Sequence, residues 1–467
     1  MIYFGDIHTH NAISYAHGSI ERGFEIAREH LDFFCLTGQN EWPDMPIMPE
    51  DRHMIWVEGH EKHRKLWPEG CAAAREAYTP GEFVTFTGYE WHSLDGDYTV
   101  VYPHDHGELL LGDTLEELAE RVRATDAIMV PHHVAYAKGW RGVDWSRFPA
   151  DLCPIVEVYS EHGNCMDDRG LHPMILHSLG GAVTKGTVSY ALASGLRFGM
   201  IASTDDHWGY PGAYREGLAA IHADKLTREA LWEAINARRT YAVTGDRIEL
   251  DFSLNDQPMG AELEFDSRRE VRVRVEAMDE IDKVEILRNG RVVHREGVAT
   301  VLPSDPFEGG RAKLRIRWGW GPWGMLTLDR ICDWRGEIEL QGASLVKATP
   351  MFQAGPFDED RRDRLTGVSD AGLSLQSFTS RKGAYGEDAT KCVMLEIEGG
   401  PEDRLVMRFT EPSEFTVERT LAEIMASGSS HFAGGFTTES VLVHRLLVPE
   451  SYALDFTWVD ESEDASA

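Results

Sequence analysis

The chain has 467 residues, of which 42% are hydrophobic and 27% are charged, as in a globular protein with more than one domain. Acidic residues outnumber basic residues by 78 to 46, which gives a formal net charge of −32. Such a negative field repels nucleic acid and anionic membrane surfaces, so we expect neither as a partner. We predict a small-molecule substrate instead, and an anionic one would need positive charge at its site, which bound metal could supply.

Targeting and redox signals predict a cytoplasmic protein. The six cysteines include no CxxC pair and show no disulfide-framework spacing, so they are interpreted as reduced thiols. The first residues lack a basic segment followed by an apolar one, which predicts no signal peptide. No apolar run reaches the length of about 18 residues that a membrane helix needs. Whether the chain forms a homo-oligomer stays open.

The opening residues combine a strand with metal-binding groups. Residues 2–4 are apolar and predict a short buried strand, and Asp6, His8 and His10 follow it at a spacing of two. Alternate side chains of an extended chain point to one face, so three potential ligands would converge at the end of this strand. The alternative is an edge strand with two surface histidines.

The same pattern recurs along the first half of the chain. Apolar segments that end in polar clusters lie at residues 31–36, 83–90, 127–131, 155–159 and 200–203. Helical segments separate them: one begins at Ser19, one lies within residues 42–78, one begins with Thr114 and Glu117 as a capping box, and one spans 227–239. Alternating strands and helices predict a parallel sheet or barrel, with the chemistry at the carboxyl ends of the strands.

From residues 244–245 onward the pattern changes to short segments that alternate apolar and polar residues. Asn289-Gly290 between two of them is a strong hairpin signal. We therefore predict an α/β domain over residues 1–245, a mostly antiparallel β-sandwich over 246–460 and an acidic tail over 461–467.

The polar groups at the predicted strand ends form a set of imidazoles and carboxylates that suits Zn²⁺, Mn²⁺ or Fe²⁺. Without metal, gathering so many such groups would cost several kcal/mol in repulsion and desolvation, on the order given for buried charges. The remaining histidines are interpreted as scattered surface residues: His30, His53, His60, His63, His104, His106 and His222.

Five motifs together resemble the successive motifs of the PHP (polymerase and histidinol phosphatase) superfamily. They are Asp6-Ile-His-Thr-His10, Leu36-Thr37-Gly-Gln39, Gly88-Tyr-Glu90, Pro131-His132-His133 and Ser203-Thr-Asp205-Asp-His207. The resemblance covers about residues 1–245 and implies a distorted, TIM-like (β/α)7 barrel with two or three metals. The segment after residue 241 is similar to a little-characterised branch of this superfamily that carries a C-terminal β domain.

The resemblance also implies a set of metal ligands. These are His8, His10 and Asp205 for a first metal, Glu90 as the bridge, His132 and His162 for a second metal, and His17, Gln39 and His207 for a third. An amide oxygen is a weaker ligand than imidazole, so Gln39 weakens the third site. We expect two divalent ions (Zn, Mn or Fe), with a third site of low occupancy as the alternative.

The function that this resemblance implies is a metal-dependent hydrolase, most simply a phosphoesterase. A metal-bridging hydroxide would attack a small-molecule phosphoester or phosphonate-type substrate. His17, His133 or His207 could donate the proton to the leaving group, and Asp206 either orients a ligand histidine or is merely solvated. The alternatives are an amide, lactone or carboxylic ester hydrolase with the same centre, or a non-catalytic metal-binding module.

Four further residues are candidates for substrate binding. His92 lies two residues after Glu90 and is either a substrate contact or a packed histidine. Arg141, Lys185 and Arg197 are candidate anion clamps, and the alternative for each is an ordinary surface salt bridge.

Overall fold

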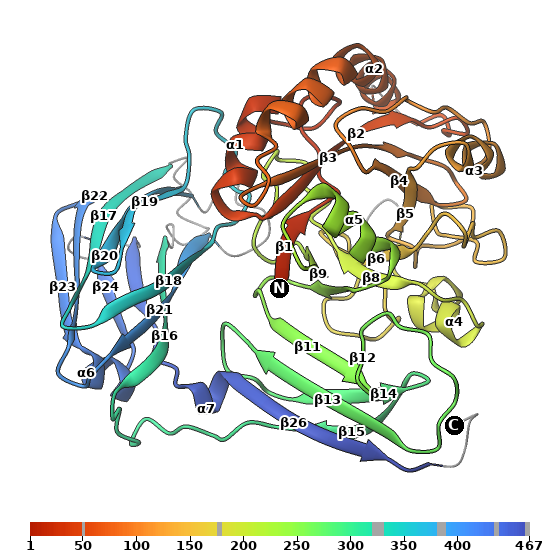
Figure 1. Cartoon of the computed structure of the whole chain (residues 1–467). Coiled ribbons are helices and arrows are strands. Elements are labelled where there is room, and N and C mark those ends of the chain that lie inside the picture. The colour runs from red at the N-terminus through yellow and green to blue at the C-terminus, as the bar shows by residue number, and fades with distance from the viewer. Residues whose placement is uncertain (49–51, 175–179, 320–330, 381–388, 434–438, 463–467) are drawn as a thin grey trace.

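The computed structural model describes residues 1–48, 52–174, 180–319, 331–380, 389–433 and 439–462 (Figure 1). The N-terminal half is built on a seven-stranded sheet with the order β10-β9-β1-β2-β3-β4-β5. Its strands are β1 (Ile2–Asp6), β2 (Phe33–Glu41), β3 (Val84–Trp91), β4 (Asp97–Tyr102), β5 (Ile128–His132), β9 (Leu218–His222) and β10 (Thr240–Val243).

This sheet is mixed, which corrects the prediction of an all-parallel sheet. β1, β2 and β3 run parallel, whereas β4 pairs antiparallel with β3 and β5, and β9 pairs antiparallel with β1 and β10. The reason at β4 is the connection: residues 92–96 are too few for the crossover that a parallel neighbour requires. The carboxyl ends of β1, β2, β3 and β5 nevertheless meet at one edge.

A second sheet continues the curved wall. It has the order β7-β6-β8, with β6 (Ile155–Ser160), β7 (Gly163–Asn164) and β8 (Gly199–Ala202). β6 and β8 are parallel, β6 lies beside β5, and β8 lies beside β10. The fold is thus mixed α/β with a curled sheet, and the coarse prediction of an α/β half is confirmed.

Four described helices pack on the outer face of this wall: α1 (Ile20–His30), α2 (Arg52–Ala77), α3 (Leu115–Arg123) and α4 (Val188–Ala193), with a 3-10 turn η1 (Thr184–Gly186) before α4 (Figure 1). α5 (Arg228–Asn236) instead packs against the strand residues of the opposite face. Ser19 and Thr114 cap α1 and α3 as predicted, and Thr227 caps α5, because each side chain accepts a bond from a first-turn amide. The second half of the predicted capping box differs, since Glu117 accepts from the Asp113 amide instead of the Thr114 amide. Both faces of β2 are buried: Phe33 packs among strand residues and Phe34 packs against α1.

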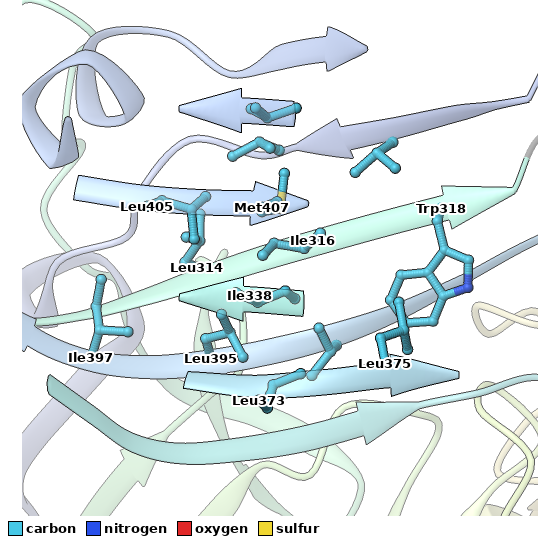
Figure 2. Close-up of a cluster of buried hydrophobic side chains, with 14 of the residues drawn as sticks. Leu314, Ile316, Trp318, Ile338, Leu373, Leu375, Leu395, Ile397, Leu405 and Met407 are labelled. Carbon is cyan, nitrogen blue, oxygen red and sulfur yellow. The ribbon is translucent and has the colours of Figure 1, made fainter. Parts of the chain in front are cut away.

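The C-terminal half is antiparallel throughout its described strands. Two five-stranded sheets, with the orders β18-β21-β16-β25-β24 and β19-β20-β17-β22-β23, pack face to face. The first has β16 (Gly310–Gly319), β18 (Ser344–Met351), β21 (Thr390–Gly399), β24 (Ser429–Phe432) and β25 (Ser440–Val443). The second has β17 (Cys332–Gln341), β19 (Arg364–Ser369), β20 (Gly372–Thr379), β22 (Arg404–Glu411) and β23 (Phe415–Thr420). Figure 2 shows the apolar side chains between them, including Ile316, Ile338 and Trp318.

A smaller β unit lies below the curled sheet in Figure 1. It is a four-stranded sheet of order β12-β11-β13-β26 with a separate hairpin, β14–β15. The strands are β11 (Glu249–Leu254), β12 (Gln257–Pro258), β13 (Arg269–Glu276), β14 (Val284–Arg288), β15 (Arg291–Glu296) and β26 (Ala453–Asp460). Asn289 and Gly290 both have positive φ, as the predicted hairpin turn requires.

The sandwich and the α/β half share apolar packing. Ile26 of α1, Tyr210 and Ala213 belong to the same buried cluster as the sandwich interior. Two short helices, α6 (Leu421–Ala426) and α7 (Pro449–Tyr452), complete the described elements. Among the described helices, none combines the length and the apolar character needed to cross a bilayer. Residues 463–467 of the predicted acidic tail lie outside the described residues.

Candidate metal centre

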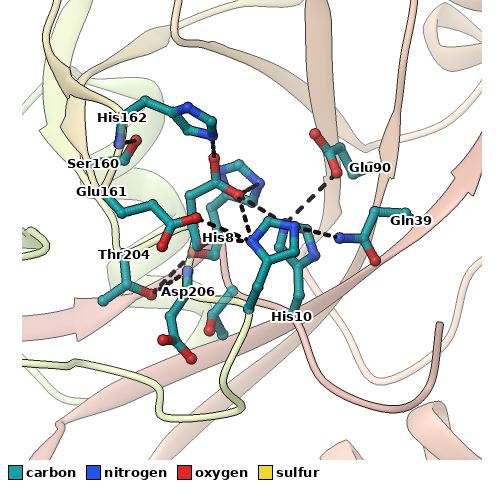
Figure 3. Close-up of polar contacts among 12 residues, drawn as sticks. His8, His10, Gln39, Glu90, Ser160, Glu161, His162, Thr204 and Asp206 are labelled. Atoms are coloured by element: carbon teal, nitrogen blue, oxygen red, sulfur yellow. Dashed lines mark hydrogen bonds and ion pairs between the residues drawn. The ribbon is translucent and has the colours of Figure 1, made fainter. Parts of the chain in front are cut away.

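Six of the predicted ligands come together at the carboxyl edge of the curled sheet. Figure 3 labels His8, His10, Glu90 and His162 among them. They are His8 and His10 after β1, Glu90 in β3, His132 at the end of β5, His162 after β6 and Asp205 after β8. Five of them are at most 2% exposed, and only the His162 side chain, at 18%, reaches solvent appreciably. The strands therefore deliver these groups to one buried point, as the strand-end pattern predicted.

Two carboxylates lie at the centre of the cluster. Glu90 Oε1 is 2.7 Å from His132 Nε2, and Glu90 Oε2 is 3.6 Å from His10 Nε2. Asp205 Oδ1 is 2.9 Å from His10 Nε2 and 3.5 Å from His8 Nε2, while Asp205 Oδ2 is 2.9 Å from His162 Nε2. Each carboxylate thus lies close to more than one imidazole.

His10 Nε2 forms a hydrogen bond with Asp205 Oδ1 at 2.9 Å, but three other atoms of the cluster are oriented as metal ligands better than as hydrogen-bond partners. His132 Nε2, His8 Nε2 and Asp205 Oδ2 are buried and lack a hydrogen-bond partner despite their close polar neighbours. Ligand atoms about 2.1 Å from one ion lie roughly 3 Å from each other, which is the spacing seen here. Buried polar atoms without partners are costly, so a divalent ion would satisfy what the protein alone leaves unsatisfied.

Further side chains orient the imidazoles through contacts to their Nδ1 atoms. His8 Nδ1 lies 2.9 Å from Glu157 Oε2, which leaves Nε2 directed at the cluster. His162 Nδ1 bonds the hydroxyl of Tyr136 at 2.8 Å, and His207 Nδ1 lies 3.1 Å from Glu161 Oε1. Such partners fix the tautomer and the ring plane of a metal-binding histidine.

The electrostatics of the metal-free cluster keep its central carboxylates ionised. Burial would raise the pKa of Glu90, but His92, His132 and His10 outweigh it and hold that pKa well below its ordinary value. Burial likewise opposes ionisation of Asp205, yet His8 and His162 hold its pKa well below the usual range. Negative charge is therefore available where a cation would bind.

The predicted third site has a different character. Gln39 is fully buried, and its Nε2 lies 3.1 Å from His207 Nε2, while its amide oxygen accepts a hydrogen bond from the Ser14 hydroxyl. His17 does not join them: it is exposed and stacks on Trp208 with ring centroids 4.9 Å apart. A hydrogen-bonded group thus occupies the place where the resemblance implied a third set of ligands.

A second buried network flanks the centre around Asp97. Its carboxylate pairs with Arg141, and Oδ2 lies 3.3 Å from His133 Nε2 and 3.9 Å from His92 Nε2. Arg141 is only 7% exposed, and its guanidinium lies 4.9 Å from the Trp42 ring centroid. Arg141 therefore neutralises Asp97 in this structure and is not directed at solvent as a free anion clamp.

His92 and Asp206 are placed close to the centre. His92 Nε2 lies 2.9 Å from Glu90 Oε2 and the ring is 1% exposed, so it contacts the candidate bridge directly. Asp206 Oδ2 accepts hydrogen bonds from the amides of Trp208 and Tyr210 at 3.0 and 2.6 Å. Asp206 is fully buried, so the alternative that it is solvated is wrong.

Two candidate anion clamps lie elsewhere in the described structure. Lys185 is exposed in η1, and Arg197 Nη1 forms an exposed ion pair with Glu262 at 2.7 Å. No described contact brings either side chain to the cluster, and for Arg197 the salt-bridge alternative describes what is seen.

The prediction that the remaining histidines are scattered surface residues is wrong for three of them. His30, His60 and His63 are at most 9% exposed. His60 packs against His92, with ring centroids 5.9 Å apart, and so belongs to the surroundings of the centre. Its place on α2, which covers this edge of the sheet, could not be read from spacing in the sequence.

Comparisons with known proteins identify relatives without an assigned activity. A family model described as "Protein of unknown function (DUF3604)" matches residues 212–264. An uncharacterized protein of Chlamydia pneumoniae is 34% identical over 235 residues, which are 45% of this chain and 38% of that protein. One from Chlamydia muridarum is 31% identical over 196 residues, 38% of this chain and 31% of that protein. The chain thus spans roughly a third of the length of these relatives.

Two solved structures are similar at a low level. A two-domain protein from Bacteroides vulgatus, which contains a predicted PHP-like metal-dependent phosphoesterase, is 11% identical with a TM-score of 0.35 and covers 90% of this chain and 95% of its own. A lesion-specific endonuclease from Pyrococcus furiosus is 14% identical with a TM-score of 0.31 and covers 50% of this chain and 56% of its own. Both scores are too low to establish a shared fold.

Proposed function

We propose that this chain is a metal-dependent hydrolase of the PHP superfamily that acts on a small-molecule phosphoester or phosphonate-type substrate. The observation that carries the proposal is the convergence of buried ligand atoms without hydrogen-bond partners, centred on Glu90 and Asp205. The strand-end motifs support it, because their ligands meet at one point. Residues 1–245 would form the hydrolase part and residues 246–460 an accessory β part.

Two divalent ions (Zn, Mn or Fe) fit the donor set best. His8, His10 and Asp205 would hold the first, His132 and His162 the second, and Glu90 would bridge them. Gln39 and His17 add no ligand to a third ion, because the first is engaged by Ser14 and His207 and the second stacks on Trp208. Of the third predicted set, His207 lies close to two other donor groups, those of His10 and Asp205. Bound divalent ions would lower the pKa of a coordinated water and offset negative charge on the attacked group.

The open side of the centre suggests where the substrate enters. The side chain of the proposed ligand His162 is 18% exposed and that of His207 beside it is 33% exposed, whereas the other five proposed ligands are buried. His207 is held through Nδ1 by Glu161, so it is fixed at this opening and could pass a proton to a leaving group. His133, 2% exposed and facing Asp97, is placed to orient neighbouring groups.

A second candidate function is hydrolysis of an amide, lactone or carboxylic ester at the same centre. The observation that favours it is the state of Arg141, whose charge is already neutralised by Asp97. A phosphoryl substrate would normally meet a free cationic side chain.

The test is a panel of substrates for the protein loaded with Zn²⁺, Mn²⁺ or Fe²⁺. We expect turnover of phosphate mono- or diesters that disappears in Asp205→Asn and depends on added metal. Turnover confined to carboxylic esters, lactones or amides would replace the phosphoesterase by the second candidate. Metal binding without turnover of any panel member would favour the non-catalytic module.

A further inference from the structure

The loop between β8 and β9 carries Asp205, Asp206 and His207. Asp205 has a φ of 55°, in the left-handed region that is uncommon for residues other than glycine, although Asp enters it more readily than most. Such a conformation persists only where the surrounding structure holds it. The amide of Asp205 donates to His8 O at 2.8 Å, and further along the loop the amide of Gly212 donates to Asp6 Oδ2 at 2.9 Å.

Tyr210 links this loop to the C-terminal half. Its amide donates to Asp206 Oδ2 at 2.6 Å, so its backbone is tied to the residue next to Asp205. Its ring is 2% exposed and packs in the sandwich cluster. Its hydroxyl donates to Asp363 Oδ2 at 3.0 Å, in the segment that precedes β19.

Asp363 is itself held firmly inside the sandwich. Lys391 Nζ donates to its Oδ2 at 2.6 Å, and the Ser377 hydroxyl donates to its Oδ1 at 2.6 Å. The Lys391 and Asp363 side chains are 1% and 0% exposed. A buried ion pair is expensive to form, and once formed with all its bonds satisfied it fixes geometry strongly.

Attachment of the two halves does not require this pair. At the same interface, exposed Glu359 accepts bonds from partly buried Ser19, and partly buried Arg362 pairs with exposed Glu25. Apolar packing of Ile26 and Ala213 adds to these contacts. The buried Asp363–Lys391 pair differs from these contacts because Tyr210 links it to the loop that carries Asp205 and His207.

We propose that Tyr210, Asp363 and Lys391 are positioning residues of the metal centre. The C-terminal sandwich holds the loop over residues 205–212 in the conformation that aims Asp205 at the histidines. This inference rests on the proposed metal-dependent function and assigns the accessory β part a task in it. The sandwich is then part of the site's architecture and not an appended binding module.

The test compares two variants of the full chain that each remove one buried hydrogen bond. Tyr210→Phe removes the bond to Asp363 and keeps the ring. The matched control, Thr379→Val, removes the acceptor of the Trp334 indole N–H, 2.8 Å away inside the sandwich, a bond in which neither Asp363 nor the 205–212 loop takes part. Zn²⁺ affinity is measured by competition with a chelating indicator, and amide hydrogen exchange of residues 204–212 is measured on metal-free protein.

We expect Tyr210→Phe to bind Zn²⁺ at least about tenfold more weakly, as is usual for partners that orient metal ligands, and to exchange faster across the loop. Thr379→Val should leave both readouts unchanged while lowering the melting temperature. A double variant, Asp363→Asn with Lys391→Met, removes both buried charges together and should weaken Zn²⁺ binding like Tyr210→Phe.

Wild-type Zn²⁺ affinity and wild-type loop exchange in Tyr210→Phe would overturn the inference while leaving the metal centre intact. Equal losses in Tyr210→Phe and Thr379→Val would also overturn it, because they would indicate a general effect of stability. A wild-type chain that binds no Zn²⁺ would remove the proposed function and the inference together.

Discussion

Several side chains of the candidate centre are buried with polar atoms that lack a hydrogen-bond partner. Glu90 is 2% exposed and within 3.6 Å of nitrogens from His10, His92 and His132. Three imidazoles around one carboxylate are stable when a cation shares the site or when protons take its place. Glu90 is therefore the residue whose replacement should have the largest effect on metal content.

Glu90→Gln should lower metal affinity by at least about 100-fold, because even indirect partners of metal ligands are worth about 10- to 100-fold. The amide keeps the shape of the side chain but removes its charge. Equilibrium dialysis against Zn²⁺ with elemental analysis measures the change. Glu41→Gln is the control, because Glu41 lies on the neighbouring strand and accepts from the Gly112 amide. Full metal retention in Glu90→Gln would remove Glu90 as the bridge.

His30 gives a pH-dependent prediction away from the centre. Burial, with Arg247 nearby, lowers the pKa of His30 to about 3, and its Nε2 bonds Pro211 O at 2.9 Å. In the unfolded chain the His30 imidazole binds a proton near pH 6.5, whereas in the folded chain it stays neutral. The free energy of unfolding therefore falls as pH falls from 6.5 to 3. At pH 5 this one group should lower the free energy of unfolding by about 2 kcal/mol.

His30→Gln should remove this share of acid sensitivity. The free energy of unfolding, measured by urea at pH 7 and pH 5, should drop by about 2 kcal/mol less in the variant than in the wild type. Exposed His106→Gln is the control and should follow the wild type. A His30→Gln profile parallel to the wild type would contradict the assignment of a neutral buried imidazole.

Secondary-structure elements explain which part of the site was predictable. The spacing of His8 and His10 and the strand ends at Glu90, His132 and Asp205 follow from apolar runs that stop at polar groups, and the structure brings these residues together. Glu157 was missed although a charge within the apolar run of β6 was a visible signal. It lies behind His8, where sequence spacing gives no partner.

Asp97 was missed for a different reason. It opens β4, and because β4 runs antiparallel its first residue lies opposite His132, the last residue of β5. The sequence pattern predicted no strand over residues 97–102 and expected only parallel strands in this half, so it placed neither Asp97 nor the Arg141 pair at this edge. Strand direction depends on pairing across the sheet, and local sequence patterns do not determine it.

Asp97→Asn should destabilise the fold by about 3 kcal/mol, because it leaves the buried Arg141 guanidinium without its counter-charge. Glu116→Gln is a matched control: it breaks another Arg–carboxylate pair, with Arg147, whose side chains are 34% and 60% exposed. That change should cost less than about 1 kcal/mol. Thermal or urea unfolding measures both, and equal losses would contradict a buried, uncompensated Arg141.

At the scale of the whole molecule, the change of sequence character near residue 245 does not coincide with independent packing. Ile26, Tyr210 and Ala213 are buried in a cluster shared with the sandwich, and Tyr214 bonds Asp246 Oδ1 at 2.7 Å. Sequence periodicity identifies where strands replace helices along the chain. It does not reveal which surfaces of the first half are covered by the second.

A chain ending at residue 245 should therefore expose apolar surface and lose the anchor of the 205–212 loop. We expect it to aggregate, or to stay in solution with reduced Zn²⁺ affinity. Size-exclusion chromatography with light scattering and Zn²⁺ titration test this, with the full chain as the reference. A truncated chain that is monomeric and binds Zn²⁺ as the full chain does would show that residues 1–245 are independent.

The most direct measurement of the central claim is metal content per chain, by elemental analysis of protein purified without added metal or chelator. The proposed centre predicts two equivalents of Zn, Mn or Fe, bound by the groups around Glu90 and Asp205. A content near zero that also resists reconstitution with these metals would contradict a metal-dependent hydrolase.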